Sequence, residues 1–189
     1  MIRRLLPIVL VLTACATAPP PDPAPPASPK RVEMVTTAGT IVIRLLPEFA
    51  PGTVAQFLRL ARAGVYDSMY FYRVEQGFVV QTATADDREV PLTPEQQAII
   101  QPIPLEPDGP LHIRGVVSLA HGDDPDSGET SFSILLGTAP HLDRKYTAFG
   151  VIIDSEETLH RIEQTYDQRA RDADGQRLQI LRMIVEETQ

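Results

Sequence analysis

The sequence predicts a mainly β fold, in the form of a closed antiparallel β-barrel whose ends are plugged by helices. Short runs rich in β-branched and aromatic residues recur between residues 31 and 185, with turns between them. Only two longer segments have the features of a principal helix. We find no internal repeat, and a chain of 189 residues is typical of one domain with appendages.

The folded part is expected to begin with a hairpin followed by a helix. Two β-like runs, Arg31–Thr37 and Thr40–Leu45, flank the dipeptide Ala38-Gly39, and a two-residue link with glycine is typical of a hairpin. Pro51 suits the first turn of a helix, and Gly64 suits its end. Between them, apolar residues recur at helical spacing: Val54, Phe57, Leu58 and Ala61.

A second hairpin and a long polar connection come next. The runs Tyr70–Val74 and Phe78–Gln81 are predicted strands joined by residues 75–77. Residues 82–112 are polar and interrupted by prolines. Within them, Thr93 and Gln96 have the spacing of a capping box, which predicts a short helix over Pro94–Ile100.

The remainder of the chain completes the barrel. We predict four further strands: Gly115–Ala120, Phe132–Leu136, Thr147–Ile153 and Arg177–Val185. A polar loop, residues 121–130, separates the first two of them. Ser155 is predicted to cap a second helix, whose first turn holds Glu156 and Glu157 near the positive end of the helix dipole.

The first fourteen residues have the features of a secretory signal peptide. Two arginines precede a short apolar run, and small residues follow before Cys15. The run is too short to span a membrane as a helix. Residues 12–15, LTAC, resemble the lipobox of bacterial lipoproteins, in which the cysteine is acylated and becomes the new amino terminus. The alternative is an ordinary signal peptide with a chance cysteine.

Residues 15–30 are interpreted as a lipidated cysteine followed by a linker. The segment ATAPPPDPAPPASPK cannot pack as helix or sheet, because proline fixes φ and lacks a backbone donor. We expect an extended spacer between a membrane anchor and a domain at residues 31–189. A proline-rich ligand for a partner is the alternative interpretation. This places the domain in the cell envelope, and in a Gram-negative cell Ala16, rather than aspartate, after Cys15 favours the outer membrane.

Charge and composition exclude several function classes. The net charge is −8 at pH 7, which argues against nucleic acid as a partner and against electrostatic binding to anionic lipid. One cysteine cannot form an intramolecular disulfide. The four histidines lie far apart without the short spacing of metal ligands, so we expect no metal site. We expect the chain to act as a monomer.

Five segments, in order, resemble the cyclophilin family, and the resemblance extends from about residue 32 to 185. It implies a closed eight-stranded antiparallel β-barrel capped by two α-helices, cis/trans isomerisation of X-Pro bonds in proline-containing polypeptides, and no cofactor. The segments are TVAQFL at 53–58, GVYD at 64–67, FYRV with GFVVQ at 71–74 and 77–81, RGVVSLA at 114–120, and LDRKYTAFG at 142–150.

The implied reaction needs a donor that stabilises a twisted amide. The X-Pro bond has partial double-bond character, and twisting it gives the prolyl nitrogen a usable lone pair. A donor that meets this lone pair binds the transition state more tightly than the ground state. Arginine stays protonated and offers a planar fork of N–H groups. Arg73, which matches the family's arginine, is therefore the candidate catalytic residue, although a surface arginine of the barrel is the structural alternative.

A proline ring needs an apolar slot, and the resemblance supplies candidates for its walls and rim. Each apolar member could instead belong to the core. Gln81 matches a glutamine that binds the substrate backbone, and Ala120 matches a small residue that flanks the groove. The full set of candidate substrate-binding residues is Phe78, Val79, Gln81, Ala120, Phe132, Ser133, Leu142 and Tyr146.

Several positions depart from the family pattern. If the register holds, Ser133 replaces an aromatic wall, whereas a one-residue shift would turn Phe132 to the other face of its strand. His141 replaces a tryptophan and Tyr146 a histidine, and Thr82 begins a segment that lacks the usual glycines. We expect a wider or differently shaped groove with weak activity. The alternative is a non-catalytic module that binds proline-containing chains. An unrelated ligand-binding barrel would require the five ordered segments to match the family by chance.

Overall fold

A computed structural model describes residues 31–82 and 84–186. The predicted signal peptide at 1–14, the lipidated Cys15 and the linker at 15–30 lie outside the described residues. None of the helices within the described part is long and apolar enough to cross a membrane.

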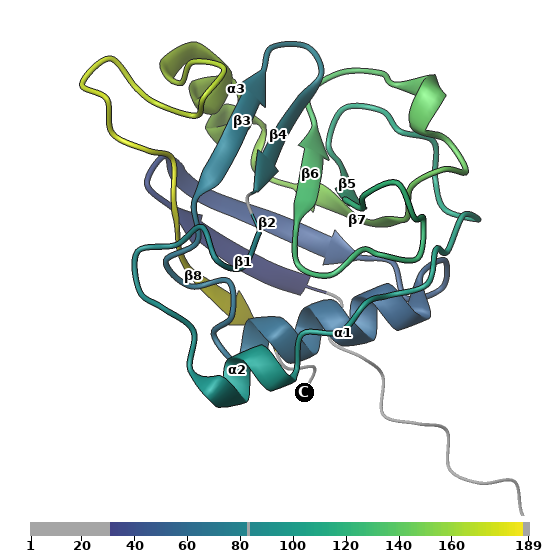
Figure 1. Ribbon diagram of the computed structural model, residues 1–189. Coiled ribbons are helices and arrows are strands. Elements are labelled where there is room, and N and C mark those ends of the chain that lie inside the picture. The colour runs from purple at the N-terminus through teal and green to yellow at the C-terminus, as the bar shows by residue number, and fades with distance from the viewer. Residues whose placement is uncertain (1–30, 83, 187–189) are drawn as a thin grey trace, which may run out of the picture.

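Eight antiparallel strands form one curled sheet, which confirms the predicted mainly β architecture (Figure 1). Their order in the sheet is β3-β4-β6-β5-β7-β2-β1-β8. The bounds are β1 Arg31–Thr36, β2 Gly39–Leu45, β3 Phe71–Glu75, β4 Val79–Thr82, β5 Val116–Leu119, β6 Phe132–Leu135, β7 Ala148–Ile153 and β8 Ile180–Val185.

The predicted closure of the barrel is not confirmed, because the outermost strands β3 and β8 share no continuous ladder within the described residues. One isolated bridge joins Tyr70 and Gln179, just before the two strands begin. The N–H of Ile180 donates to the carbonyl oxygen of Met69 over 2.8 Å. Farther along, the loop before β8 rather than β8 itself lies against β3, where the N–H of Val74 donates to the carbonyl oxygen of Gln168 over 3.4 Å.

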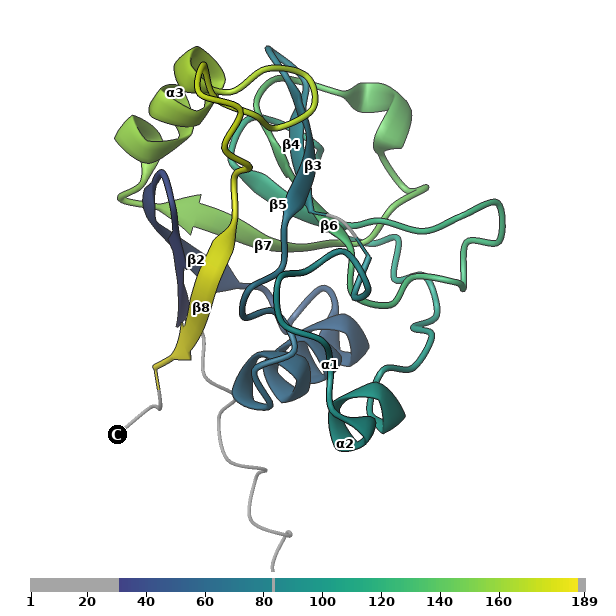
Figure 2. The same ribbon diagram turned by 60° about the vertical axis from the view of Figure 1, so that its left-hand side comes forward.

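Two principal helices cover opposite ends of the curled sheet (Figures 1 and 2). Helix α1, Pro51–Arg62, begins at the expected proline and buries the four apolar residues that the sequence selected. Gly64 follows with φ +69°, a left-handed conformation that glycine adopts at no steric cost. Helix α3, Glu156–Thr165, packs at the other end and buries Leu159 and Ile162.

Ser155 occupies the position before α3, but its side chain does not cap the helix as predicted. The hydroxyl oxygen instead accepts the N–H of Val42 over 2.7 Å, and the hydroxyl donates to the carbonyl oxygen of Ile153 over 2.8 Å. This buried serine therefore links β2 to the end of β7, next to the cross-strand pair of Val42 and Ile153. A tertiary bond outweighs the local capping preference here.

The short helix α2, Pro94–Ala98, confirms the predicted capping box and ends two residues earlier than expected. Thr93 and Gln96 exchange hydrogen bonds of 3.0 and 3.2 Å between side chain and backbone. The amide of Gln96 also donates to the carbonyl oxygen of Ala63 over 2.8 Å. The box thus starts α2 and also attaches it to the end of α1.

The core lies inside the curl of the sheet, with a second, smaller apolar cluster on its outer face. Four buried aromatic rings fill the interior beside α1, namely Phe57, Tyr66, Phe132 and Phe149. The outer cluster contains Val79, Val116, Leu135, Ala139 and Ala148, and Phe78 and Leu142 pack against it half-buried. This outer cluster supports the groove described next.

Candidate functional site

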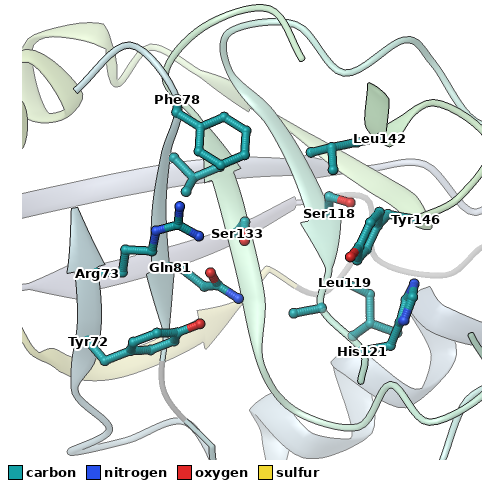
Figure 3. A pocket seen from close by; sticks show the side chains of 12 residues that line it. Tyr72, Arg73, Phe78, Gln81, Ser118, Leu119, His121, Ser133, Leu142 and Tyr146 are labelled. Carbon is teal, nitrogen blue, oxygen red and sulfur yellow. The ribbon is translucent and has the colours of Figure 1, made fainter. Parts of the chain in front are cut away.

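One row of cross-strand neighbours brings together residues that are far apart in sequence. Arg73 on β3 faces Gln81 on β4, Gln81 faces Ser133 on β6, and Ser133 faces Ser118 on β5. Directly opposed residues project from the same face of a sheet. Their side chains therefore share the outer face, where they form the middle of a groove (Figure 3).

The groove contains seven of the eight residues predicted to bind substrate, together with the candidate catalytic arginine. Its cavity volume of about 220 Å³ is below the range typical of pockets for drug-sized ligands, and suits one ring with a flanking peptide unit. The lining residues are Tyr72, Arg73, Phe78, Val79, Gln81, Ser118, Leu119, Ala120, His121, Ser133, Leu142 and Tyr146.

Phe132 is the predicted site residue that the structure does not bring to the groove. Its ring is fully buried in the core, where it meets Phe57 edge-on at 5.7 Å between centroids. The alternation of β6 sends Phe132 and Ile134 inward and leaves Ser133 facing outward. The prediction for Phe132 is therefore corrected, and the groove has a serine where the family pattern has an aromatic wall.

The guanidinium of Arg73 is held by two neighbours. One nitrogen donates a hydrogen bond to the carboxylate of Glu75, two residues farther along β3. The guanidinium carbon lies 5.2 Å from the ring centroid of Phe78, within the range of a cation–π contact. The Arg73 side chain is 38% exposed, so its charge can meet a ligand in the groove without full desolvation.

A β-bulge explains why Tyr72 also reaches the groove, which the sequence analysis missed. The register between β3 and β4 shifts between Phe71 and Arg73, so that strict alternation is lost. Tyr72 and Arg73 thus line one groove, while Phe71 and Val74 are both buried. Partial burial raises the pKa of Tyr72, an effect that nearby Arg73 opposes, so the phenol stays a hydrogen-bond donor.

The wall formed by Phe78 depends on a close backbone approach. The N–H of Leu136 donates to the carbonyl oxygen of Phe78 over 2.8 Å. At the next residue, Gly137, a Cβ would lie only 1.9 Å from the carbonyl oxygen of Gly77, so no larger residue fits. Phe78 also stacks obliquely on His141, with 5.6 Å between ring centroids.

The opposite side of the groove is formed by the end of the short 3-10 helix Pro140–Leu142 and the turn that follows it (Figure 3). Leu142 faces Phe78 across the slot, and Tyr146 stacks on His121 with centroids 4.2 Å apart. The N–H groups of Lys145 and Tyr146 both donate to the carbonyl oxygen of Leu142, over 3.0 and 3.2 Å. This turn brings Leu142 and Tyr146 to one wall.

Three further lining residues were missed by the sequence analysis, namely Ser118, Leu119 and His121. All three are close sequence neighbours of Ala120, which was predicted. Their position beside Ala120 was therefore the signal that could have identified them. Among the described residues, no group of three or more histidine, cysteine or acidic side chains is arranged to hold a metal ion.

The arrangement combines a cationic fork with an apolar slot. Phe78, Val79 and Leu142 can enclose an apolar ring, while Arg73 and Gln81 present polar groups beside it. Such a site can bind an uncharged amide and stabilise a lone pair that develops on it.

The comparisons agree on one family. The model of the cyclophilin type peptidyl-prolyl cis-trans isomerase/CLD family matches residues 31–185. The chain is 38% identical over 162 residues to peptidyl-prolyl cis-trans isomerase CYP23 of Arabidopsis thaliana, covering 85% of this chain and 71% of the relative. It is 34% identical over 137 residues to the human peptidyl-prolyl cis-trans isomerase-like 3, covering 70% and 81%.

A bacterial relative and a solved structure extend this finding. The chain is 26% identical over 163 residues to a probable peptidyl-prolyl cis-trans isomerase of Brucella suis, covering 83% of this chain and 81% of the relative. A crystal structure of a Cryptosporidium parvum cyclophilin type peptidyl-prolyl cis-trans isomerase, in the presence of the dipeptide Ala-Pro, superposes with a TM-score of 0.69. That match has 22% sequence identity and covers 84% of this chain and 99% of the other, so it shows the fold.

Proposed function

The chain belongs to the family of cyclophilin-type peptidyl-prolyl cis-trans isomerases and is such an isomerase, and we propose that it acts on proline-containing proteins of the bacterial cell envelope through the groove around Arg73. The observation that carries the proposal is the row Arg73, Gln81, Ser133 and Ser118 beside the apolar slot. The solved Cryptosporidium parvum relative was crystallised in the presence of the dipeptide Ala-Pro, and a dipeptide of this size fits the volume of the groove.

Arg73 is the proposed catalytic residue. Rotation about the X-Pro bond passes through a state in which amide resonance is lost and the prolyl nitrogen carries a lone pair, and the barrier is about 18–20 kcal/mol. The guanidinium, steadied by Glu75 and Phe78, can donate to this lone pair from the side of the slot. Because no covalent bond is made or broken, the reaction calls for no cofactor.

The proline ring is proposed to rest between Phe78 and Leu142, with Val79 beneath it. Gln81 offers both a donor and an acceptor to the peptide backbone, and Tyr146 offers a phenol at the opposite rim. These contacts hold the residues on either side of the X-Pro bond while the bond twists. The slot therefore binds the proline ring, whereas Arg73 stabilises the twisted amide more than the planar one.

One observation favours a second candidate function, that of a non-catalytic module for binding proline-containing chains. Ser133 lies where an aromatic wall is expected from the family pattern, so the slot holds a proline ring on fewer sides. A proline ring with fewer contacts can bind without its nitrogen lying where the Arg73 guanidinium can donate to it. Retention of Arg73 and Gln81 at adjacent positions favours the enzyme.

The place of action rests on the amino-terminal segment. We propose that Cys15 is acylated, that residues 16–30 form a spacer, and that the domain faces the extracytoplasmic side, at the outer membrane in a Gram-negative cell. Replacing Cys15 with serine should move the protein from the membrane fraction to the soluble fraction or leave it unprocessed. Equal membrane partitioning of the variant would contradict the anchor.

The proposed role of the groove around Arg73 is tested by exchange spectroscopy on an Ala-Pro-containing peptide with catalytic amounts of the full chain. Catalysis that is lost in the Arg73→Ala variant supports the enzyme. Peptide binding without catalysis, in both proteins, would favour the binding module instead.

A further inference from the structure

Beneath the groove, a buried histidine joins two of its walls. His112 is 1% exposed and belongs to the connection before β5. Its Nε2 lies 2.9 Å from the hydroxyl oxygen of Ser118, which lines the slot, and its Nδ1 lies 3.0 Å from Oδ1 of Asp143. Asp143 directly follows Leu142, the opposite wall.

The chemistry of the partners fixes the direction of these hydrogen bonds. The same Asp143 oxygen accepts the backbone N–H of His112 over 2.8 Å, and this bond lowers the pKa of the carboxyl group. A carboxylate only accepts, so Nδ1 carries the proton. In the neutral imidazole Nε2 is then an acceptor, and the hydroxyl of Ser118 donates to it.

We propose that Asp143 and His112 form a positioning relay that turns the Ser118 hydroxyl proton away from the slot, so that an apolar proline ring can be buried against Ser118. The inference rests on the groove being the proline site. A serine beneath an apolar ring is costly if its hydroxyl has no partner once water is displaced. His112 supplies that partner from below the groove and does not touch the substrate.

The order Ser118, His112, Asp143 is also that of a hydrolytic triad, but its surroundings do not suit nucleophilic catalysis. An acyl intermediate needs donors for its oxyanion. The two backbone N–H groups after Ser118 are already used, since Leu119 donates to the carbonyl oxygen of Thr147 over 2.9 Å and Ala120 to that of Ser131 over 2.8 Å. The constellation therefore serves to orient the hydroxyl.

Two amide replacements of His112 separate its two hydrogen bonds. In His112→Gln the amide reaches the place of Nε2 and can still accept from Ser118, whereas in His112→Asn it reaches only the place of Nδ1. We expect His112→Asn to raise the KM for an Ala-Pro-containing peptide about five- to tenfold more than His112→Gln does. Both variants should change kcat less than KM.

The Ser118→Ala background provides the matched test. In this background there is no hydroxyl to orient, so His112→Asn should cause no further loss of peptide affinity. In the natural chain the same substitution should lower the affinity. A loss of equal size in both backgrounds would overturn the relay, because a merely structural defect does not depend on the hydroxyl. So would equal effects of the two amide variants.

A measurement on the unmodified full chain keeps the inference testable if His112→Asn fails to fold. Two-bond 15N–1H correlation spectra assign the tautomer of His112. We expect the proton on Nδ1, and a proton on Nε2 alone would overturn the relay. Labelling of Ser118 by a fluorophosphonate would support the nucleophilic triad instead and likewise overturn it.

The same experiments separate this inference from the proposed function. If the unmodified chain binds no proline-containing peptide in a titration, the proposed site fails. If it binds the peptide and the double-variant pattern is absent, only the relay fails.

Discussion

Replacing Arg73 with alanine should remove most of the isomerase activity and little of the stability. The guanidinium is proposed to donate to a lone pair that exists only in the twisted amide. A hydrogen bond from a charged donor contributes about 1.5–3 kcal/mol, which corresponds to a loss in kcat of roughly 10- to 150-fold. Arg73→Lys should recover part of the loss, since a point charge lacks the planar fork.

The expected cost in stability follows from the contacts of Arg73. Its ion pair joins side chains that are 38% and 45% exposed, and pairs at such exposure contribute about 0–1 kcal/mol. The cation–π contact with Phe78, at 5.2 Å, adds about 0.5–1 kcal/mol. The melting temperature should therefore fall by only a few degrees.

The assay is exchange spectroscopy on an Ala-Pro-containing peptide, with a melting curve for each variant. Arg31→Ala is the matched control, because Arg31 is a similarly exposed arginine on β1, 43% exposed and paired with Glu186. It should keep full activity. Phe78→Ala should mainly raise KM, since it removes a wall rather than the donor. Equal kcat in the natural chain and in Arg73→Ala would refute the mechanism.

Three further predictions follow from the same contacts. Glu75→Gln should lower kcat about two- to fivefold in the natural chain and have no effect in the Arg73→Ala background, as steady-state assays can test. Ser133→Phe should tighten binding of an Ala-Pro peptide severalfold by restoring an aromatic wall, and weaker binding in a titration would contradict this. Because the folded state lowers the pKa of Asp143, its contribution to stability is present above about pH 4 and is lost as pH falls below its depressed pKa. The difference in stability between the natural chain and Asp143→Asn should therefore shrink in acid, and denaturant titrations across this range measure it.

Local patterns predicted the elements of the fold well, because each depended on neighbours in sequence. The capping box of α2 and the apolar stripe of α1 are such cases. The unused cap at Ser155 was not predictable, since its acceptor oxygen is taken by Val42, 113 positions away. The incomplete pairing between β3 and β8 was likewise not predictable, because it depends on the contact between two segments that are distant in sequence, around Tyr70 and Gln179.

For the site, the resemblance located the residues but could not fix their neighbours. Arg73 was predicted, whereas its hydrogen bond to Glu75 depends on the rotamers of two exposed side chains. Tyr72 was missed because a bulge breaks the alternation that the sequence analysis assumed. His112 and Ser118 were missed as a pair, because only the folded chain brings the loop before β5 beneath the groove.

The register of β6 decides whether Phe132 or Ser133 meets the substrate, and two side chains fix it. The hydroxyl oxygen of Thr82 accepts the N–H of Phe132 over 3.0 Å, and the hydroxyl of Ser131 donates to the carbonyl oxygen of Thr82 over 2.8 Å. Both bonds join the end of β4 to the start of β6, where a one-residue slip would exchange the two faces. Thr82 and Ser131 therefore act together on the register of β6. They keep the phenyl ring in the core and leave Ser133 in the groove.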